Sequence, residues 1–407
     1  MEAQFQLSTI HYKKDSYIVV EGKQNADRFY IIQQGKVRVS KEVVVAEEDG
    51  QILSPGDFFG VISTMSSHSH IETAQAMTDV VLVTVLRDQY GTLIQKSNQV
   101  AMKIIMQFSR QLRYLNETLA GKALKKTAEI VPAHLFEVAE YYFSQKRYNE
   151  ALYGYTHYLK YCPDGEHAGA AQTCVEELKT RVTGTAAEFG QNDVNRTYRK
   201  NIMFFAEGEP GEELFIIQKG SVKITKIVGD NEVLLAVLKA GDIFGEMALL
   251  EGKPRAATAV AYEDTDVMVV NRANFQRMIQ TQPQLVTKVT TLLADRVWLI
   301  YKQLANTFIA NPQGRMYDSL LVQLEKNRVP LDSQNPYLFS FGLQELTNMV
   351  GLTGREARQA QAEVMENKNI QIINDKMQVT TPGEILKMAE YFRKMDRIEK
   401  SRKETQS

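Results

Sequence analysis

Two stretches of this chain resemble each other, and this internal repeat limits the folds that the chain can adopt. The segment 29–35 (Phe-Tyr-Ile-Ile-Gln-Gln-Gly) recurs as 214–220 (Leu-Phe-Ile-Ile-Gln-Lys-Gly), and 55–60 (Pro-Gly-Asp-Phe-Phe-Gly) recurs as 240–245 (Ala-Gly-Asp-Ile-Phe-Gly). Each copy consists of short apolar runs separated by turn residues, which predicts two antiparallel β-rolls. The expected strands are 17–20, 29–33, 36–40 and 80–85 in the first copy, and 214–218, 221–227, 233–238 and 267–270 in the second.

The second copy continues into a stretch, 244–258, whose residues suit a phosphate group. Gly245 permits a tight turn, and the residues after it can form one helical turn whose first N–H groups lack partners within the helix. Free N–H donors and the helix dipole both favour an anion at that position. Arg255 can add a planar, two-pronged donor for the same anion, and Glu246 can accept a hydrogen bond from a sugar hydroxyl.

The residues Phe-Gly-Glu-x-Ala-Leu (244–249) and Pro-Arg-Ala-Ala-Thr (254–258) resemble the phosphate-binding cassette of cyclic-nucleotide-binding domains, as in the catabolite activator protein and the regulatory subunits of protein kinase A. The resemblance implies that Arg255 holds the exocyclic phosphate and Glu246 the ribose 2′-hydroxyl. In the kinase branch of this family, a threonine directly after the arginine favours guanine. This chain has an alanine there, Ala256, so the resemblance implies cAMP rather than another cyclic nucleotide. The alternative is an ordinary loop with a surface salt bridge between the two side chains. The ligand would be lined by Gly245, Met247, Ala248, Ala256 and Ala257.

The first copy lacks the two charged residues of this pattern. When the copies are aligned, Val61 stands in the place of Glu246, and His70 stands in the place of Arg255. A valine accepts no hydrogen bond, and a neutral histidine is a poor substitute for a guanidinium beside an anion. We therefore expect the first roll to keep the fold and to have lost the usual ligand. His68 and His70 are expected in a solvated loop rather than at a metal site.

Between the rolls, the segment 131–182 changes to a helical pattern that resembles a tetratricopeptide repeat (TPR). One repeat with a following helix is a weak signal, because such units need neighbours to bury their faces. Two interpretations of its many tyrosines stay open: the core of a helix pair, which we favour, or a docking surface for a protein partner. The resemblance depends on Leu135, Val138, Ala139, Tyr142, Ala151, Tyr155 and Pro163.

A long helix is predicted over 284–309, where apolar residues follow steps of three and four and form one stripe. In the catabolite-activator family the equivalent helix pairs with its copy in a dimer and touches the nucleotide base, which implies a homodimer through this helix. The family's hydroxyl-bearing positions are Ile300 and Tyr301 here, so Tyr301 or Trp298 is expected either to stack on the purine or to pack in the dimer.

The C-terminal part resembles the winged helix–turn–helix of the catabolite-activator/FNR regulators. Two short helices at 343–349 and 354–366 flank a turn, and 371–380 forms a hairpin, the wing. Four Lys/Arg oppose six Asp/Glu in 341–384, which is unfavourable for DNA, whereas the tail holds seven basic and four acidic residues. The residues expected to contact DNA are Thr353, whose hydroxyl can also cap the helix, together with Arg355, Arg358 and Gln359.

These patterns predict a multidomain α+β chain with two β-roll (double-stranded jelly-roll) cyclic-nucleotide-binding domains, a helical TPR-like insert and a C-terminal winged helix–turn–helix. The predicted parts are a degenerate cyclic-nucleotide-binding-like domain (1–96), a connecting helix (97–130), the insert (131–182), a cyclic-nucleotide-binding domain (190–282), a long dimerisation helix (283–310), the winged helix–turn–helix (311–385) and a basic tail (386–407).

Composition narrows the classes of function. A net charge of −1 gives no overall attraction to nucleic acid or membrane, no apolar run reaches membrane-spanning length, and two cysteines are too few for a disulfide framework. No nucleophile–base pairing, lysine-bearing phosphate loop or metal-ligand spacing suggests an enzyme or a cofactor. We therefore expect a cytoplasmic, cyclic-nucleotide-responsive DNA-binding transcription regulator. The alternative is a nucleotide-sensing scaffold whose winged helix no longer reads DNA.

Overall fold

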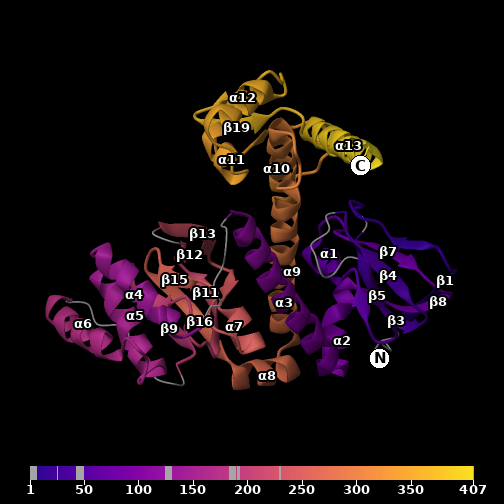
Figure 1. Cartoon of the computed structure of the whole chain (residues 1–407). Helices are drawn as coiled ribbons and strands as arrows, with labels where there is room; N and C mark the ends of the chain where they lie inside the picture. The colour runs from indigo at the N-terminus through magenta and orange to yellow at the C-terminus, as the bar shows by residue number, and fades with distance from the viewer. Residues whose placement is uncertain are drawn as a thin grey trace. The chain divides into compact units, whose positions relative to one another are not determined.

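The computed structural model of the chain (Figure 1) describes residues 7–24, 26–42, 50–123, 131–182, 189, 193–228 and 231–406. The chain divides into two compact units, one comprising Met1–Arg87 with Ala294–Ser407 and the other Asp88–Leu293. Within the predicted domains, the residues 1–6, 25, 43–49, 124–130, 190–192, 229–230 and 407 lie outside the described residues. None of the described helices combines the length and the apolar character that crossing a lipid bilayer requires.

The first roll belongs to the first unit. Its two four-stranded antiparallel sheets have the strand orders β1-β8-β3-β6 and β2-β7-β4-β5. Side chains that alternate along the strands fill the space between the sheets, and Val37, Ala74 and Leu82 are fully buried there. The four predicted strands are confirmed, with ends shifted by at most one residue. The elements are β1 (Ser8–Tyr12), β2 (Tyr17–Val19), β3 (Arg28–Gln34), β4 (Val37–Ser40), β5 (Gln51–Leu53), β6 (Phe58–Phe59), α1 (Val61–Ser66), β7 (Thr73–Ala76) and β8 (Val80–Leu86).

The second roll, in the other unit, repeats this architecture with the strand orders β14-β11-β16-β9 and β10-β15-β12-β13. Aromatic side chains dominate its core: Phe244 stacks on Phe215 with ring centroids 5.0 Å apart and meets Phe204 edge-on, also at 5.0 Å. The elements are β9 (Asn195–Tyr198), β10 (Met203–Phe205), β11 (Glu213–Lys219), β12 (Ser221–Val228), β13 (Asn231–Lys239), β14 (Ile243–Phe244), α7 (Glu246–Glu251), β15 (Thr258–Ala261) and β16 (Thr265–Asn271).

Helix α3 (Asn98–Ala123) follows the first roll in sequence but packs against α7 of the second roll. Arg113 Nε donates to Glu251 Oε2 at 2.7 Å, and Ser109 Oγ donates to Glu251 Oε1 at 2.9 Å. Arg113 and Glu251 are both nearly buried, so this ion pair fixes the end of α7 to α3. The remaining helices beside the rolls are η1 (Arg87–Gln89), α2 (Tyr90–Lys96), α8 (Arg272–Thr281) and α9 (Pro283–Asn306).

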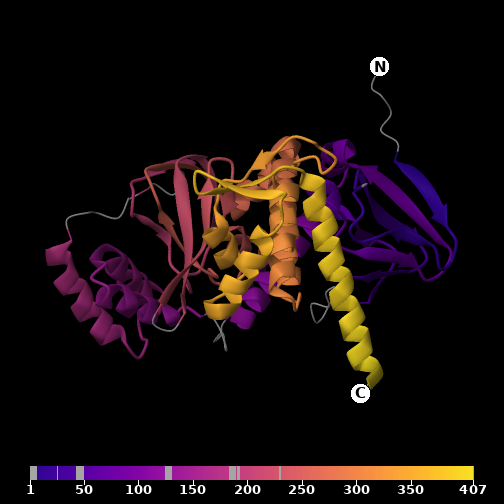
Figure 2. The same cartoon turned by 90° about the horizontal axis from the view of Figure 1, so that it is seen from above.

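The segment between the rolls forms α4 (His134–Ser144), α5 (Tyr148–Tyr161) and α6 (Ala168–Arg181), which lie beside the second roll (Figures 1 and 2). Gly154 allows α5 to approach α4 closely, since a Cβ there would sit 2.9 Å from Ala139 Cβ. Tyr142, Tyr155 and Tyr158 are buried in the helix core. The favoured interpretation of these three tyrosines as core is confirmed, whereas the resemblance to a TPR stays a prediction.

The C-terminal module of the first unit is a small helical layer on a three-stranded sheet with the order β17-β19-β18. Gly351, at φ +68°, makes the turn between α11 and α12. Apolar side chains from all of these helices share one core with the sheet, including Tyr317, Phe339 and Val364. The elements are α10 (Pro312–Lys326), β17 (Tyr337–Leu338), α11 (Leu343–Met349), α12 (Gly354–Met365), β18 (Ile370–Ile373), β19 (Lys376–Val379) and α13 (Pro382–Gln406).

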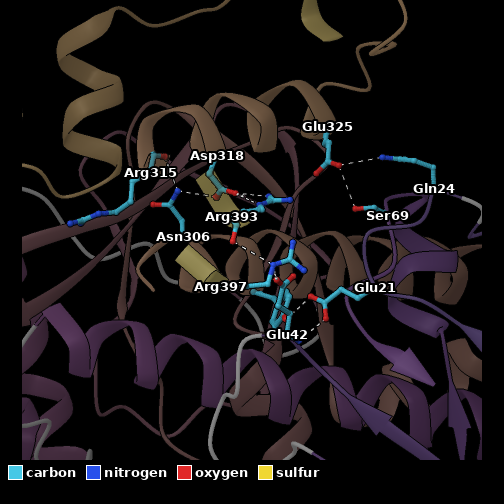
Figure 3. A network of polar contacts seen from close by, with 11 residues as sticks. Glu21, Gln24, Glu42, Ser69, Asn306, Arg315, Asp318, Glu325, Arg393 and Arg397 are labelled. Atoms are coloured by element: carbon cyan, nitrogen blue, oxygen red, sulfur yellow. Dashed lines mark hydrogen bonds and ion pairs between the residues drawn. The ribbon is translucent and has the colours of Figure 1, made fainter. Parts of the chain in front are cut away.

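A buried carboxylate joins three of these helices (Figure 3). Asp318 of α10 accepts a hydrogen bond from Arg393 Nε at 2.7 Å and from Asn306 Nδ2 at 2.9 Å. Arg393 belongs to α13 and Asn306 ends α9. The predicted tail forms helix α13. Arg393 holds this helix to the module through a buried, charge-assisted hydrogen bond to Asp318.

We predict that Arg113→Ala lowers the free energy of unfolding by about 3 kcal/mol, because it leaves the buried Glu251 carboxylate without its near counter-charge. Lys253 Nζ, 3.8 Å from Glu251, is exposed and offsets only part of this loss. Denaturant unfolding followed by circular dichroism measures the change. Arg110→Ala, on an exposed position of the same helix, is the matched control and should change stability by less than about 0.5 kcal/mol. Equal effects of the two substitutions would contradict the prediction.

Candidate functional site

The two rolls hold their cassettes in the same backbone frame. In the second roll, the amide of Gly208 donates to Arg255 O at 2.9 Å, and the amide of Arg255 donates to Glu209 O at 2.8 Å. The first roll repeats this pair of bonds, which places His70 at the position of Arg255 and allows the side chains of the two cassettes to be compared position by position. Its two bonds run from Gly22 N to His70 O (2.8 Å) and from His70 N to Lys23 O (2.9 Å).

Gly245 begins the cassette of the second roll in a left-handed conformation, at φ +77°. A side chain there would collide with the arginine, because a Cβ would lie 2.6 Å from Arg255 Nη1. Helix α7 starts at the next residue and points its first turn inward, so Glu246 is only 1% exposed. Met247 and Ala248 are buried beside it. The residues expected around the ligand therefore lie together at one end of α7.

The Arg255 side chain is buried, with 5% of the residue exposed. Its Nη1 donates to Gly245 O at 2.6 Å, its guanidinium lies 4.1 Å from the centroid of the Phe205 ring, and its Nε has no hydrogen-bond partner. Burial lowers the pKa of this guanidinium, but an arginine stays charged at neutral pH. The alternative of a surface salt bridge with Glu246 does not fit, since both side chains are buried.

The carboxylates of Glu209, Glu213 and Glu246 act on the Arg255 guanidinium electrostatically. Glu213 accepts two hydrogen bonds from Arg196, at 2.7 and 2.8 Å. Glu209 Oε2 lies 2.9 Å from the hydroxyl of Tyr153 and 3.1 Å from the amide of Ala206. Two of the three carboxylates are therefore hydrogen-bonded to groups other than Arg255.

Two residues that shape this site were not recognised from the sequence. Gly211 lies against the guanidinium, so closely that a Cβ would stand 2.3 Å from Arg255 Nε. Phe205 supplies the ring face on which the guanidinium rests. The sequence around Gly211 contains no signal that this glycine makes room for the side chain of Arg255, which lies far along the chain.

The first roll fills the corresponding position with its own carboxylate. Val61 and His70 are both buried, with exposed fractions of 2% and 3%. Glu72 stands where the second roll has Ala257, and its Oε1 accepts a hydrogen bond from the amide of Gly60 at 2.6 Å. This amide opens α1 as Gly245 opens α7. An internal acid thus occupies the cassette of the first roll, a feature that the sequence comparison missed.

A family model described as "Cyclic nucleotide-binding domain" matches residues 9–97 and 195–282. The chain is 30% identical, over 162 residues, to the Cyclic AMP receptor protein of Thermus thermophilus, a match that covers 40% of this chain and 71% of that protein. The chain belongs to the cyclic nucleotide-binding domain family. It carries two such domains of the CRP/FNR type.

Over 160 residues the chain is also 26% identical to the CRP-like cAMP-activated global transcriptional regulator of Mycobacterium tuberculosis, a match that covers 39% of this chain and 71% of that protein. Among solved structures, the Thermus thermophilus catabolite activator protein matches with a TM-score of 0.26 at 24% identity, covering 49% of this chain and 90% of that one. The Mycobacterium tuberculosis relative is by its name a transcription regulator.

Two aromatic residues of α9 contact the first cyclic nucleotide-binding domain. Tyr301 is buried, and its hydroxyl donates to Glu21 Oε1 at 2.9 Å; its contact with a purine stays a prediction. Trp298 Nε1 donates to Ser69 O, and its ring stacks on His68 at 4.1 Å. His68 and His70 are therefore buried, not solvated. Among the described residues, no group of three or more potential ligands could hold a metal ion.

The residues expected to contact DNA gather on one exposed face of α12. Arg355, Arg358 and Gln359 are exposed, while Ala357 and Ala360 face the module's core. Thr353 precedes the helix but makes no capping hydrogen bond with its side chain, so that part of the expectation is wrong.

We predict that Glu72→Ala destabilises the first cyclic nucleotide-binding domain by about 1–3 kcal/mol, because the buried amide of Gly60 loses its acceptor. Glu72→Gln keeps a carbonyl oxygen at the same place and should cost about 1 kcal/mol or less. Thermal unfolding of the full chain measures both. Equal losses would mean that the hydrogen bond to Gly60 contributes nothing.

Proposed function

We propose that this chain is a cyclic-nucleotide-responsive, DNA-binding transcription regulator whose ligand, cAMP, binds the second domain. One observation carries the proposal: Arg255 is a buried cation with an unused Nε–H, and two of the carboxylates that act on it, Glu209 and Glu213, are hydrogen-bonded to other groups. A buried charge without a counter-ion is costly, and the exocyclic phosphate of a cyclic nucleotide would supply that counter-ion. The family membership and the regulator relatives support the same function.

In this proposal each residue of the cassette has a defined part. Arg255 binds the phosphate through charge-assisted hydrogen bonds, and the carboxylate of Glu246 accepts a hydrogen bond from the ribose 2′-hydroxyl. Gly245 keeps the backbone close to the ligand. Small and apolar side chains form the surrounding walls, namely Met247, Ala248, Ala256 and Ala257.

A ligand at this position would act on two helices through α7. Glu251, at the end of α7, is paired with Arg113 of α3, and the carbonyl of Leu249 accepts a hydrogen bond from Arg272 of α8. Because ligand binding can only shift a population between arrangements that it binds differently, α7 is the element whose position we expect to differ. Helices α3 and α8 would transmit that difference.

The predicted homodimer through 284–309 stays a prediction, and one observation counts against it. The apolar stripe of α9 is already buried within a single chain, including Val289, Leu293, Val297 and Leu304. A second copy would need to displace that packing. The exposed face of α12 is the candidate DNA-reading surface. A single module of this kind can contact one half-site of DNA without forming a dimer.

We predict that Arg255→Ala lowers cAMP affinity by about a hundredfold or more, the effect of losing two charge-assisted hydrogen bonds. Gly211→Ala should cost about tenfold, because its Cβ displaces the guanidinium without removing it. Titration calorimetry on the full chain measures affinity and stoichiometry, with one cAMP per chain expected. Gly169→Ala is the matched control, since a Cβ there meets no atom within 4 Å. Wild-type affinity in Arg255→Ala would remove the basis of the proposal.

A second function is favoured by the charge of the reading module. With four basic residues against six acidic ones in 341–384, the module is a weak electrostatic match for DNA, and a nucleotide-sensing scaffold would need no DNA contact. Partner docking at 131–182 would belong to this alternative.

We predict that Arg355→Ala with Arg358→Ala abolishes a cAMP-dependent mobility shift on genomic DNA fragments, because each base-reading arginine contributes about 1–3 kcal/mol. Arg181→Ala, an exposed arginine of the insert, is the control and should leave the shift unchanged. If the wild-type chain with bound cAMP gives no shift even at low salt, the scaffold function stands instead.

A further inference from the structure

The helical insert contacts three glutamates of the second cyclic nucleotide-binding domain: Glu207 and Glu209, which are buried in the turn after β10, and Glu232 on β13. The insert's core is continuous with that of the domain, where Met203 and Val260 join its buried cluster. The polar contacts are His134 Nε2 to Glu207 Oε1 (3.8 Å), Tyr153 OH to Glu209 Oε2 (2.9 Å), His157 Nε2 to Glu209 Oε1 (3.8 Å), and Tyr142 OH to Glu232 Oε1 (3.0 Å).

Glu209 is the glutamate that matters for the cassette. Its carbonyl accepts the amide hydrogen of Arg255, so the two residues are neighbours across the turn. Its carboxylate also acts electrostatically on the Arg255 guanidinium. A carboxylate that formed an ion pair with Arg255 would neutralise the one cation proposed to bind the ligand.

Tyr153 holds this carboxylate on the side of the insert. Its hydroxyl lies 2.9 Å from Glu209 Oε2 and 3.2 Å from Phe204 O. The ring stacks on His157 with centroids 3.8 Å apart, which fixes its direction. Burial and the nearby carboxylate raise the pKa of Tyr153 well above its ordinary value, so the phenol remains protonated and able to donate. The amide of Ala206 is a further donor to the same oxygen.

We propose that the insert is part of the ligand-binding machinery of the second domain: Tyr153 is a positioning residue that withholds the Glu209 carboxylate from Arg255 and so keeps the guanidinium available to an anionic ligand. The proposal rests on the proposed function for the identity of that ligand. The competition itself, in which the Glu209 carboxylate can pair with either the Tyr153 hydroxyl or the Arg255 guanidinium, does not depend on which ligand binds. It implies that any displacement of α5 also weakens binding of the ligand.

The test compares Tyr153→Phe with the double variant Tyr153→Phe/Glu209→Gln in the full-length chain. Tyr153→Phe frees the carboxylate to pair with Arg255, and cAMP affinity should fall by about tenfold. Glu209→Gln removes the competing charge in the double variant, and affinity should return to within about threefold of the wild type. A merely structural loosening of the insert would not be rescued in this way. Tyr155→Phe, which loses a hydroxyl–carboxylate contact to Glu140 inside the insert, is the matched control.

A second readout needs no ligand. In arginine-labelled protein, the Nε–H resonance of Arg255, assigned by its loss in Arg255→Lys, should shift downfield in Tyr153→Phe and return in the double variant. An unmoved resonance in Tyr153→Phe would overturn the inference, as would an affinity loss that Glu209→Gln does not rescue. If the wild-type chain takes up no cAMP but the resonance moves as expected, the competition is supported and the proposed ligand is the part that fails.

Discussion

The buried charge of Arg255 is the constraint on which the second domain depends. Arg255 is 5% exposed and its guanidinium forms no hydrogen-bonded ion pair with a carboxylate of the described residues, so the surrounding residues have to offset the cost of removing its charge from water. The ring of Phe205 supports its face, two glycines leave it room, and two of the acids that act on it, Glu213 and Glu209, are bound by Arg196 and Tyr153. These contacts come from strands, a turn and the insert, so the apparently separate parts of this unit serve one electrostatic arrangement.

Much of this could be predicted from the sequence, because the signals are local. Short apolar runs predicted four strands in each roll, with ends within one residue in the first roll and within two in the second, whereas the other strands of the rolls were not predicted. The spacing between Glu246 and Arg255 indicated a cassette, and the structure brings Arg255 to its first glycine, Gly245. What could not be predicted depends on contacts between distant residues. Tyr153 and Glu209 are far apart along the chain, and only the packing of α5 on the domain brings them together. Likewise, nothing near Trp298 indicates that its partner is the carbonyl of Ser69.

The C-terminal module joins its two short helices by polar as well as apolar contacts. The amide of Gln361 on α12 donates to Thr347 Oγ1 of α11 at 2.9 Å and lies 3.3 Å from Gln344 Oε1. These partners satisfy a partly buried amide, whose burial without hydrogen bonds would be costly. The contact lies between the two helices and leaves the outer face of α12, with Arg355 and Arg358, exposed.

The carboxylate of Glu72 occupies the place where the second roll has a small side chain, and it accepts a hydrogen bond from the amide of Gly60. Because this acid is tethered to the chain, its effective concentration at that amide is high, and an external anion would have to displace it. If cAMP binds only the second roll, as we propose, a single chain should show a hyperbolic binding curve without cooperativity between its two rolls.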